Sequence, residues 1–389
     1  MSNNRIYYAT EQVAIKGDAT SYNFNDLDSV HGAQSAGITT EFNLQQIFEL
    51  GQQAIYENIE DLPDVSVTLN KVLDGYPLIY HKATVDAVSP TLAGRSNAKC
   101  IVGLAVYPDT NEASEGTPGT VVAMSGMYVS SVTYNFPLED AFNEDVTLVG
   151  NNKIWAQPPS YGQTLNPGLA TPAFTGTSAF AGNDDAPIGQ GGVNRRENLL
   201  FTVQTGLTVD TNGQVKDSDA TILPMQVLGV SSSGTHDLTD ANRAKLSSIT
   251  VSVDLGRTEL NELGRKGPYH RVVDFPIEVT TDIEVTAHSG DMISATEDGI
   301  FTTGTSCGDD LGNLLNSTIR IATCEGTRVY LGLKNKLASV NHSGGDTSGG
   351  NVTVTYSFST FNDFTVLHSG DPHASGTTWW TNRDTYLLD

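Results

Sequence analysis

One stretch of this sequence occurs in two related copies, and that repeat constrains the fold more than any other feature. The first copy covers residues 38–69 and the second begins at Ile249. Each copy opens with Ile-Thr in an alternating apolar segment and continues to a Glu-Leu-Gly sequence that ends at Gly51 or Gly264. Because alternation with period two places one face of a strand on a core, both copies begin with a predicted strand.

A proline follows each glycine by twelve positions, Pro63 in the first copy and Pro276 in the second. Each proline opens another alternating segment, and proline is tolerated at the first residue of a strand. Between the strands, Leu44, Ile47 and Phe48 fall at helical spacing, and the second copy has a similar pattern. The sequence therefore predicts strand, short helix, strand, with each glycine in the left-handed conformation just past its helix.

Further matches follow in the same order along both halves of the chain. Val-Thr-Tyr-Asn-Phe, with Tyr134 at its centre, is echoed by Val-Thr-Tyr-Ser-Phe, with Tyr356 at its centre. Upstream, the spacing of glycine and serine after Val30 resembles the spacing after Val227. A repeat with so long a period indicates a duplicated domain rather than a solenoid. The alternative explanation for these matches is that they are short sequence patterns common to β proteins in general.

Composition and charge limit the class of protein. A chain of 389 residues can form two domains with sizeable cores. With 21 Lys and Arg against 45 Asp and Glu, the formal net charge is −24, which argues against binding to nucleic-acid phosphates or to an anionic membrane. No apolar run approaches membrane length, and the N-terminus lacks the apolar core of a signal peptide.

The three cysteines, Cys100, Cys307 and Cys324, have no metal-type spacing and fit a reduced compartment. Whether Cys307 and Cys324 pair depends on whether neighbouring strands bring them together, which the sequence leaves open.

Short strands at regular spacing, with few helices, indicate a mainly β chain. We expect one β-sandwich or barrel domain at residues 1–155 and a second at 199–389, each with a short helix, arising by internal duplication. Residues 156–198 are rich in proline and glycine and poor in periodicity, so we expect them to form an extended connection.

No constellation of catalytic residues can be assembled from the sequence. Residues 304–308 match the G-x-S-x-G nucleophile elbow, but they lie in a polar Thr-Gly-rich loop rather than after a buried strand. Glu278, Asp282 and Glu284 alternate along one predicted strand, which fits either a glycosidase cleft or a charged, water-facing strand. Acidic pairs in loops lack an EF-hand spacing. We therefore expect no enzymatic activity, no cofactor and no metal site.

Two longer segments carry a family resemblance. Residues 38–52, ITTEFNLQQIFELGQ, and residues 132–155, VTYNFPLEDAFNEDVTLVGNNKIW, resemble virion structural proteins of tailed bacteriophages, in particular the proteins that build the tail tube. The resemblance covers most of residues 30–155, and the matched pairs Gly51 and Gly264, Pro63 and Pro276 extend it to the second half. These segments contain no catalytic residue that could be compared one by one.

The resemblance implies a β-sandwich or small barrel whose copies join edge to edge into stacked rings around a channel. With two domains per chain, three chains could form each ring, and six chains are the second choice. It further implies double-stranded DNA and a tape-measure protein in the lumen without specific binding, a sheath or tail-terminator protein as a further partner, and no membrane. The protein would be made in the host cytoplasm and reside in the virion. An acidic channel would not hold DNA back, because like charges repel.

Two other classes remain open from the sequence. One is another virion component, such as a capsid, decoration or baseplate protein. The other is a surface-polysaccharide hydrolase or binding module, because acidic β-rich chains are equally natural there.

Overall fold

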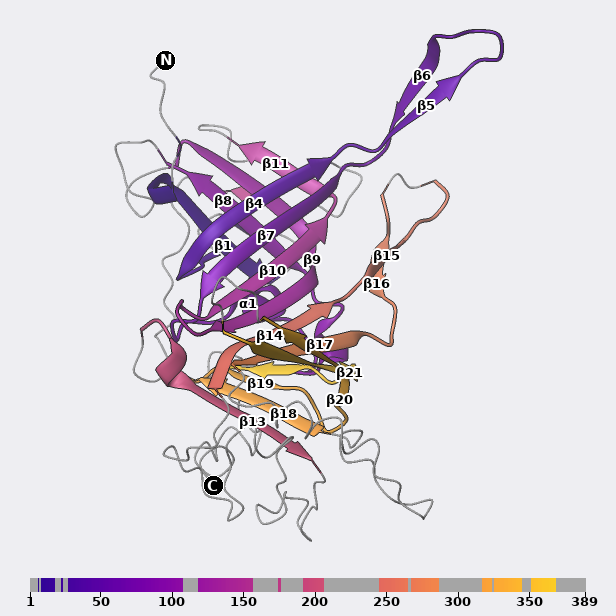
Figure 1. Ribbon diagram of the computed structural model, residues 1–389. Helices are drawn as coiled ribbons and strands as arrows, with labels where there is room; N and C mark the ends of the chain where they lie inside the picture. The colour runs from indigo at the N-terminus through magenta and orange to yellow at the C-terminus, as the bar shows by residue number, and fades with distance from the viewer. Residues whose placement is uncertain are drawn as a thin grey trace, which may run out of the picture.

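The computed structural model describes residues 6, 8–17, 22–23, 27–107, 118–156, 174–175, 192–205, 245–264, 267–286, 317–323, 325–344 and 351–368. Within them the chain is mainly β, as the sequence predicts, with large antiparallel sheets (Figure 1). The helical segments in this part are all short. They are η1 (Tyr8–Thr10), α1 (Ile79–Ala83), α2 (Leu92–Arg95) and η3 (Arg196–Asn198).

The largest sheet contains strands from both halves of the sequence. Its main path runs β20-β21-β17-β14-β9-β10-β7-β4, and every neighbouring pair is antiparallel. The strands of this path are β4 (Ala33–Glu41), β7 (Asp64–Val72), β9 (Thr120–Pro137), β10 (Asn143–Gly150), β14 (Lys245–Asp254), β17 (Glu278–Thr286), β20 (Lys336–Ser343) and β21 (Thr353–Phe361).

Alternating side chains make these segments strands with one dry face. In β7, Val65, Val67 and Leu69 are buried, whereas Ser66 and Thr68 on the opposite face are more exposed. The same alternation runs through β10, the second half of β9, β17 and β21. One face of the sheet therefore packs on the core and the other carries polar side chains.

The order of strands in this sheet is the same in the two halves. Numbered along the chain, the first half places its strands in the order first, second, fourth, third, as β4-β7-β10-β9. The second half places them in the same order, as β14-β17-β21-β20. We call these two sets of strands unit 1 and unit 2. They join where β14 pairs with β9, from Ser248 opposite Pro137 to Asp254 opposite Ser131.

Each unit carries a further layer of strands. The N-terminal part of β9 leaves the main path and pairs with β8 and β11, and β8 in turn pairs with β1. On the side of unit 2, four strands form a separate sheet in the order β13-β18-β19-β22. These strands are β1 (Glu11–Gly17), β8 (Cys100–Val106), β11 (Asn152–Ala156), β13 (Leu199–Thr205), β18 (Ser317–Thr323), β19 (Arg328–Tyr330) and β22 (Thr365–Leu367). Three further short strands are β2 (Tyr22–Asn23), β3 (Asp28–Ser29) and β12 (Phe174–Thr175).

One contiguous hydrophobic cluster fills the space between the layers of both units. The segment from α1 to α2 lies at the junction, because His81 Nε2 lies 3.0 Å from the carbonyl oxygen of Val366 on β22. The Tyr80 ring on α1 packs edge-on against Phe364, with centroids 6.0 Å apart. The two halves therefore share a sheet and a core, and the domain boundaries expected at residues 155 and 199 stay a prediction.

The predicted short helices at residues 44–51 and 255–264 are wrong. The chain forms β-hairpins there, β5 (Leu44–Phe48) with β6 (Ile55–Glu60), and β15 (Arg257–Leu260) with β16 (His270–Val273). Both hairpins leave the body on the same side (Figure 1). Leu44, Ile47 and Phe48 fit a helix by spacing, but a short apolar run does not separate helix from strand. The β-branched and aromatic residues of β6 provide a strand partner that a local reading overlooks.

Candidate functional site

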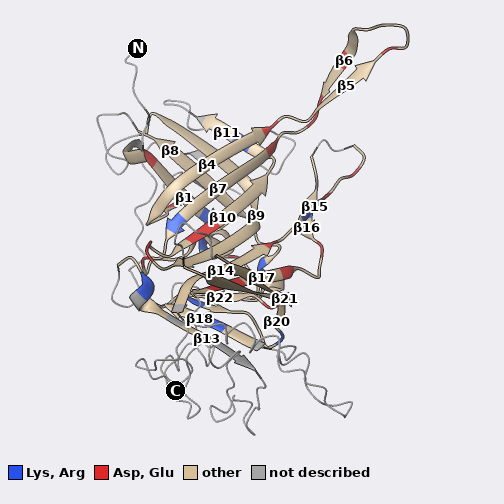
Figure 2. Ribbon diagram, in the orientation of Figure 1, with Lys and Arg blue, Asp and Glu red and all other residues tan. Residues whose placement is uncertain are grey.

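The polar face of the shared sheet is the first candidate surface. At its described positions the side chains are mostly Ser, Thr and Asn, with seven carboxylates and one basic residue, Lys336. The carboxylates are Glu41, Asp64, Asp145, Asp254, Glu278, Asp282 and Glu284. The strand ribbons of this sheet carry more red than blue in Figure 2. The surface is hydrophilic and predominantly anionic.

A hydrogen-bond network crosses this face from β7 to β14. Asp145 accepts from Asn70 Nδ2 at 2.7 Å and from Asn135 Nδ2 at 3.0 Å. Asn135 Nδ2 also donates to Asn143 Oδ1 at 2.9 Å. The side-chain oxygen Oδ1 of Asn135 accepts from the Thr250 hydroxyl of unit 2 at 3.3 Å. Because these bonds span four strands, the network fixes the polar face across the junction of the units.

The acidic row predicted on one strand lies on this face. Glu278 Oε1 accepts from Ser359 Oγ at 2.6 Å, and Asp282 Oδ1 accepts from Ser357 Oγ at 2.6 Å. Glu284 accepts from Ser248 Oγ at 3.1 Å. The three carboxylates thus line up along β17 and bond to hydroxyls of adjacent strands, as expected for a charged, water-facing strand.

The two ends of the main path are the second candidate surface. Within the part of the chain that the structure describes, β4 pairs only with β7, and β20 pairs only with β21. Half-buried apolar side chains stand along both edges, namely Ala36 and Ile38 on β4, and Leu337 and Val340 on β20. An unpaired strand edge is a template for pairing with another strand.

Ion pairs anchor the second hairpin on unit 1. Arg271 on β16 is 8% exposed and donates through Nη2 to Asp64 Oδ1 at 2.8 Å and to Asn151 Oδ1 at 3.0 Å. It also pairs with Glu259 on β15. Asn43 Nδ2 donates to Asp64 at 3.0 Å from the base of the first hairpin. Both hairpins therefore meet at the Asp64 carboxylate.

Burial would raise the pKa of Asp64, but hydrogen bonds from Asn43, Arg271 and Asn151, together with the charge of Arg271, hold it below its usual value. Arg257 strengthens the same anchor, because its Nε donates to the Val129 carbonyl at 2.7 Å. Its guanidinium also lies 4.7 Å from the centroid of the Tyr128 ring. Desolvation lowers the pKa of Arg257 to about 10, so it stays charged at neutral pH.

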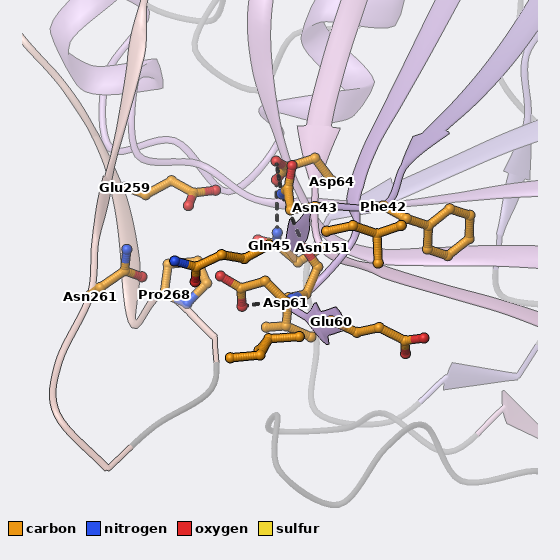
Figure 3. A pocket seen from close by; sticks show the side chains of 13 residues that line it. Phe42, Asn43, Gln45, Glu60, Asp61, Asp64, Asn151, Glu259, Asn261 and Pro268 are labelled. Carbon is orange, nitrogen blue, oxygen red and sulfur yellow. Dashed lines mark hydrogen bonds between the residues drawn. The ribbon is translucent and has the colours of Figure 1, made fainter. Parts of the chain in front are cut away.

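An open hollow of about 720 Å³ lies beside this anchor. The first hairpin contributes Phe42, Gln45 and Glu60 to its wall, and the second contributes Glu259 and Asn261 (Figure 3). In Figure 3 the side chains drawn for the two hairpins stand on opposite sides of the space. The wall is mixed and contains no pairing of nucleophile and base, so we assign it no chemistry.

The first hairpin carries apolar side chains in water along its whole length. Every residue of β5 and β6 is exposed. Phe48 is 61% exposed and Leu50, beside the tip, is fully exposed. The other exposed apolar residues of this arm are Phe42, Leu44, Ile47, Ile55, Tyr56 and Ile59. A two-stranded hairpin is marginally stable alone, and a patch of this kind marks a contact surface.

A buried carboxylate holds the α1 segment under the sheet. Glu144 on β10 accepts from the backbone N–H groups of Ile79 and Tyr80 at 2.7 and 3.1 Å, and from the Tyr134 hydroxyl at 2.8 Å. Burial raises the pKa of Glu144, although these three donors partly offset the effect. Burial, with the nearby Glu144, also raises the pKa of Tyr134. The arrangement is structural, because it lies inside the core.

The residues that mark the sequence repeat lie as follows. Gly51 and Gly264 sit at the tips of the two hairpins with φ of +93° and +89°. The left-handed conformation expected of them is therefore present, at a hairpin turn instead of a helix end. Pro63 directly precedes β7, and Pro276 lies two residues before β17.

Tyr134 and Tyr356 are both buried in the sheet, but they do not occupy corresponding strands. Tyr134 lies on β9, the third strand of unit 1, whereas Tyr356 lies on β21, the fourth strand of unit 2. The echo of their sequences thus does not mark the structural correspondence of the units.

Several sequence features lie outside the described residues. They are the G-x-S-x-G match at 304–308, the acidic pairs at 184–185, 217–219 and 309–310, and the cysteines Cys307 and Cys324. Cys100 is buried. Among the described residues, no group of three or more His, Cys, Asp or Glu could hold a metal ion, and no helix is long and apolar enough to cross a membrane.

Sequence reasoning missed the arginine anchor and did not identify which two strands stand at the ends of the sheet. Arg271 and Asp64 are 207 residues apart, so no local pattern connects them. The alternating polarity of β4 was visible, but which strand would stand at the end of the sheet depends on the long-range pairing of β9 with β14.

Comparison with known proteins gives little direct guidance. No protein-family model matches the chain, and no curated protein sequence matches it. Among solved structures, the chain is similar to the anti-feeding prophage cap (the AFP tube terminating cap) with 15% identity and a TM-score of 0.29, over 40% of this chain and 94% of that one. It is also similar to a chain in the virion of a native gene transfer agent (GTA) particle with 8% identity and a TM-score of 0.25, over 45% of this chain and 98% of that one. At these scores neither likeness establishes what this chain does.

Proposed function

We propose that this chain is a structural protein of a tailed-bacteriophage virion that polymerises into the tail tube, a hollow channel for the passage of the genome. The observation that carries the proposal is the shared sheet, whose end strands β4 and β20 each pair on one side only within the described residues, and which has one dry and one anionic face. Lateral pairing of these edges between copies would satisfy both and close a ring.

Two other properties support a channel. The strands of the polar face carry seven carboxylates, of which Asp64 is paired with Arg271 of β16, against one basic residue at their described positions. The hydrogen-bonded side chains of this face are fixed by neighbouring strands. In a ring with the additional strand layers outside, this face lines the lumen. DNA phosphates would then slide past an anionic wall without being held.

The exposed arm fits the stacking of one ring on another. In a ring built by lateral pairing, the strands run from rim to rim. The β5–β6 hairpin continues β4 and β7 beyond the end of the sheet (Figure 1), so its apolar side chains would reach past the rim. Contact with the next ring would remove them from water.

Electron microscopy of the purified full-length protein tests this function. We expect rings or stacked tubes with a central hole, and symmetry averaging of one ring would count three or six chains. A dispersed monomer that cleaves or binds a polysaccharide would overturn the proposal in favour of the hydrolase or binding-module class. A closed shell or a single peripheral complex would favour a capsid, decoration or baseplate protein.

The lining of the channel has its own test. Replacing Glu278 and Asp282 with lysine should leave ring formation intact, because both side chains are exposed. Assembled tubes of the variant should retain linear double-stranded DNA that wild-type tubes release, with the DNA protected from nuclease. Retained DNA that stays open to nuclease would place this face on the outside.

A further inference from the structure

The strand bulges of the two units occupy the same places. On β4 the extra residue is Gln34, between residues paired with Lys71 and Asn70 of β7. On β14 the extra residue is Ser247, between residues paired with Val285 and Glu284 of β17. Seven positions after each bulge the first strand ends, at Glu41 and at Asp254. A bulge is a specific, register-fixing feature, so the first strands can be aligned residue by residue.

A second pair of bulges aligns the third strands. On β9 the extra residue is Ser130, between Val129 and Ser131, which pair with Leu148 and Thr147 of β10. On β20 the extra residue is Ala338, between Leu337 and Ser339, which pair with Phe358 and Ser357 of β21.

Both alignments agree with the ladders of the strands that lie between. Let Ser131 correspond to Ser339 and Asp254 to Glu41. The residue pairs of β4 with β7, of β7 with β10 and of β10 with β9 then match those of β14 with β17, of β17 with β21 and of β21 with β20. One alignment therefore covers the eight strands of the main path and both pairs of bulges.

We infer that the junction of β9 with β14 is the template for the contact between two copies of this chain, in which β20 of one copy pairs with β4 of the next in the same register. This inference rests on the proposed function, because it names the partner of the open edges. In the junction, Ser131 faces Asp254 and Thr133 faces Ser252. The corresponding pairs between copies are Ser339 with Glu41, and Asn341 with Thr39.

The chemistry of these edges suits that register. On the polar face, Ser339 and Asn341 offer hydrogen-bond donors to Glu41 and Thr39, and no two like charges oppose each other. On the core face, Val340 comes to lie opposite Thr40. The half-buried Ile38 of β4 faces His342 of β20 and is covered by the new strand. The junction itself also shows how the strand end is bonded, because the Leu255 N–H donates to the carbonyl of the bulge residue Ser130 at 2.8 Å.

Cross-linking of the full-length protein tests the register. In a background with Cys307→Ser and Cys324→Ser, which leaves the buried Cys100, Asn341→Cys is combined with Thr39→Cys and treated with a short thiol cross-linker. We expect covalent multimers with ~10-fold higher yield than in the shifted controls Asn341→Cys with Ser35→Cys and Asn341→Cys with Gly37→Cys, because the thiols must lie within a few ångströms.

A charge cycle gives an independent readout. Ser339→Glu places a carboxylate opposite Glu41 and should raise the concentration needed for ring assembly, because like charges directly opposite destabilise a strand pair. Adding Glu41→Lys to Ser339→Glu should restore assembly. The matched control is Ser357→Glu on β21, which lies inside the sheet and should not respond to Glu41→Lys.

The outcomes separate the two proposals. Rings whose best cross-link falls on another register, or that lack a cross-link between β4 and β20, overturn this inference and leave the tube. A protein that forms no multimer at any concentration overturns the proposed function itself. Preferential cross-linking of Asn341→Cys with Thr39→Cys, together with charge rescue, supports both.

Discussion

Arg271 of the β15–β16 hairpin and Asp64 of unit 1 are joined by an ion pair with 2.8 Å between Nη2 and Oδ1. The bond fixes the β15–β16 hairpin on the end of β7, and Glu259 and Asn151 complete the ring of acceptors around the guanidinium. The second hairpin is thus clamped by charge, whereas the first hairpin projects with apolar side chains in water.

Arg271→Met should loosen the second hairpin. The substitution leaves Asp64 and Glu259 close together without a cation, at a cost of about 1–2 kcal/mol because both carboxylates remain partly solvated. Hydrogen exchange of β15 and β16 should become faster. The exposed Arg196 offers the control Arg196→Met, which should leave exchange in this hairpin unchanged.

Acid should weaken the same anchor. Because the folded pKa of Asp64 lies below its value of 3.8 in the unfolded chain, its contribution to stability is fully present above that value. It is lost as the pH falls through the folded pKa, when the carboxylate takes up a proton. We expect the protection factors of the β16 amides, which compare the observed exchange rate with the intrinsic rate at the same pH, to fall on acidification below about pH 4. Asp64→Asn should show a flatter response in this range, and equal pH responses in both proteins would contradict the assignment.

Valine at the hairpin tips should disturb assembly. Gly51 and Gly264 have positive φ, and a residue with a Cβ in this conformation is strained by ~1–2 kcal/mol. The space around both glycines is open, so the strain comes from the backbone alone. Gly51→Val and Gly264→Val should reduce ring or tube formation in sedimentation. Gly51→Asn serves as the control, since asparagine tolerates the left-handed region.

The buried carboxylate under the sheet should not accept an amide in its place. Glu144 receives three donors, and Glu144→Gln turns an NH₂ group toward one of them. We expect a loss of about 1–3 kcal/mol in the free energy of unfolding, measured with denaturant. Tyr134→Phe removes a single donor and should cost less. Wild-type stability in Glu144→Gln would mean that the carboxyl group is protonated and donates a hydrogen bond itself.

The apolar arm should act in stacking but not in ring closure. Phe48→Ser combined with Leu50→Ser removes exposed apolar surface from the first hairpin without touching the core. Single rings should persist while tubes become shorter or absent in negative-stain images. Val88, which is 88% exposed in the connection after α1, provides the control Val88→Ser. Loss of single rings in the double variant would assign the arm to lateral contacts instead.

Much of the fold could be predicted from local patterns. Alternation marked β4, β7, β14 and β17, and the two glycines were correctly expected at positive φ. The helical spacing of Leu44 and Phe48 led to a wrong helix prediction. The five residues of β5 fit both the helical period of 3.6 and the strand period of 2, and pairing with β6 decides in favour of the strand.

The sheet order and the arginine anchor could not be predicted in the same way. They depend on contacts between residues far apart in sequence, such as Val132 with Val253. The likeness of the segments around Tyr134 and Tyr356 suggested that their strands correspond in the two copies, but they lie on the third strand of unit 1 and the fourth strand of unit 2. The same alternating apolar pattern serves any strand with one face on a core. Only the bulges, which the sequence does not reveal, give the units a residue-level alignment.

The pairing of β9 with β14 within one chain has a consequence for growth and for evolution. Half of the joints in an assembled ring would be made during folding and cannot fall apart on dilution, while the other half must obey mass action. Selection can therefore weaken or strengthen the contacts between chains without changing the folding stability of the single chain. It can also give the two hairpins different functions. The β15–β16 hairpin, held by ion pairs, and the β5–β6 hairpin, with exposed apolar side chains, would then alternate around the rim of the ring.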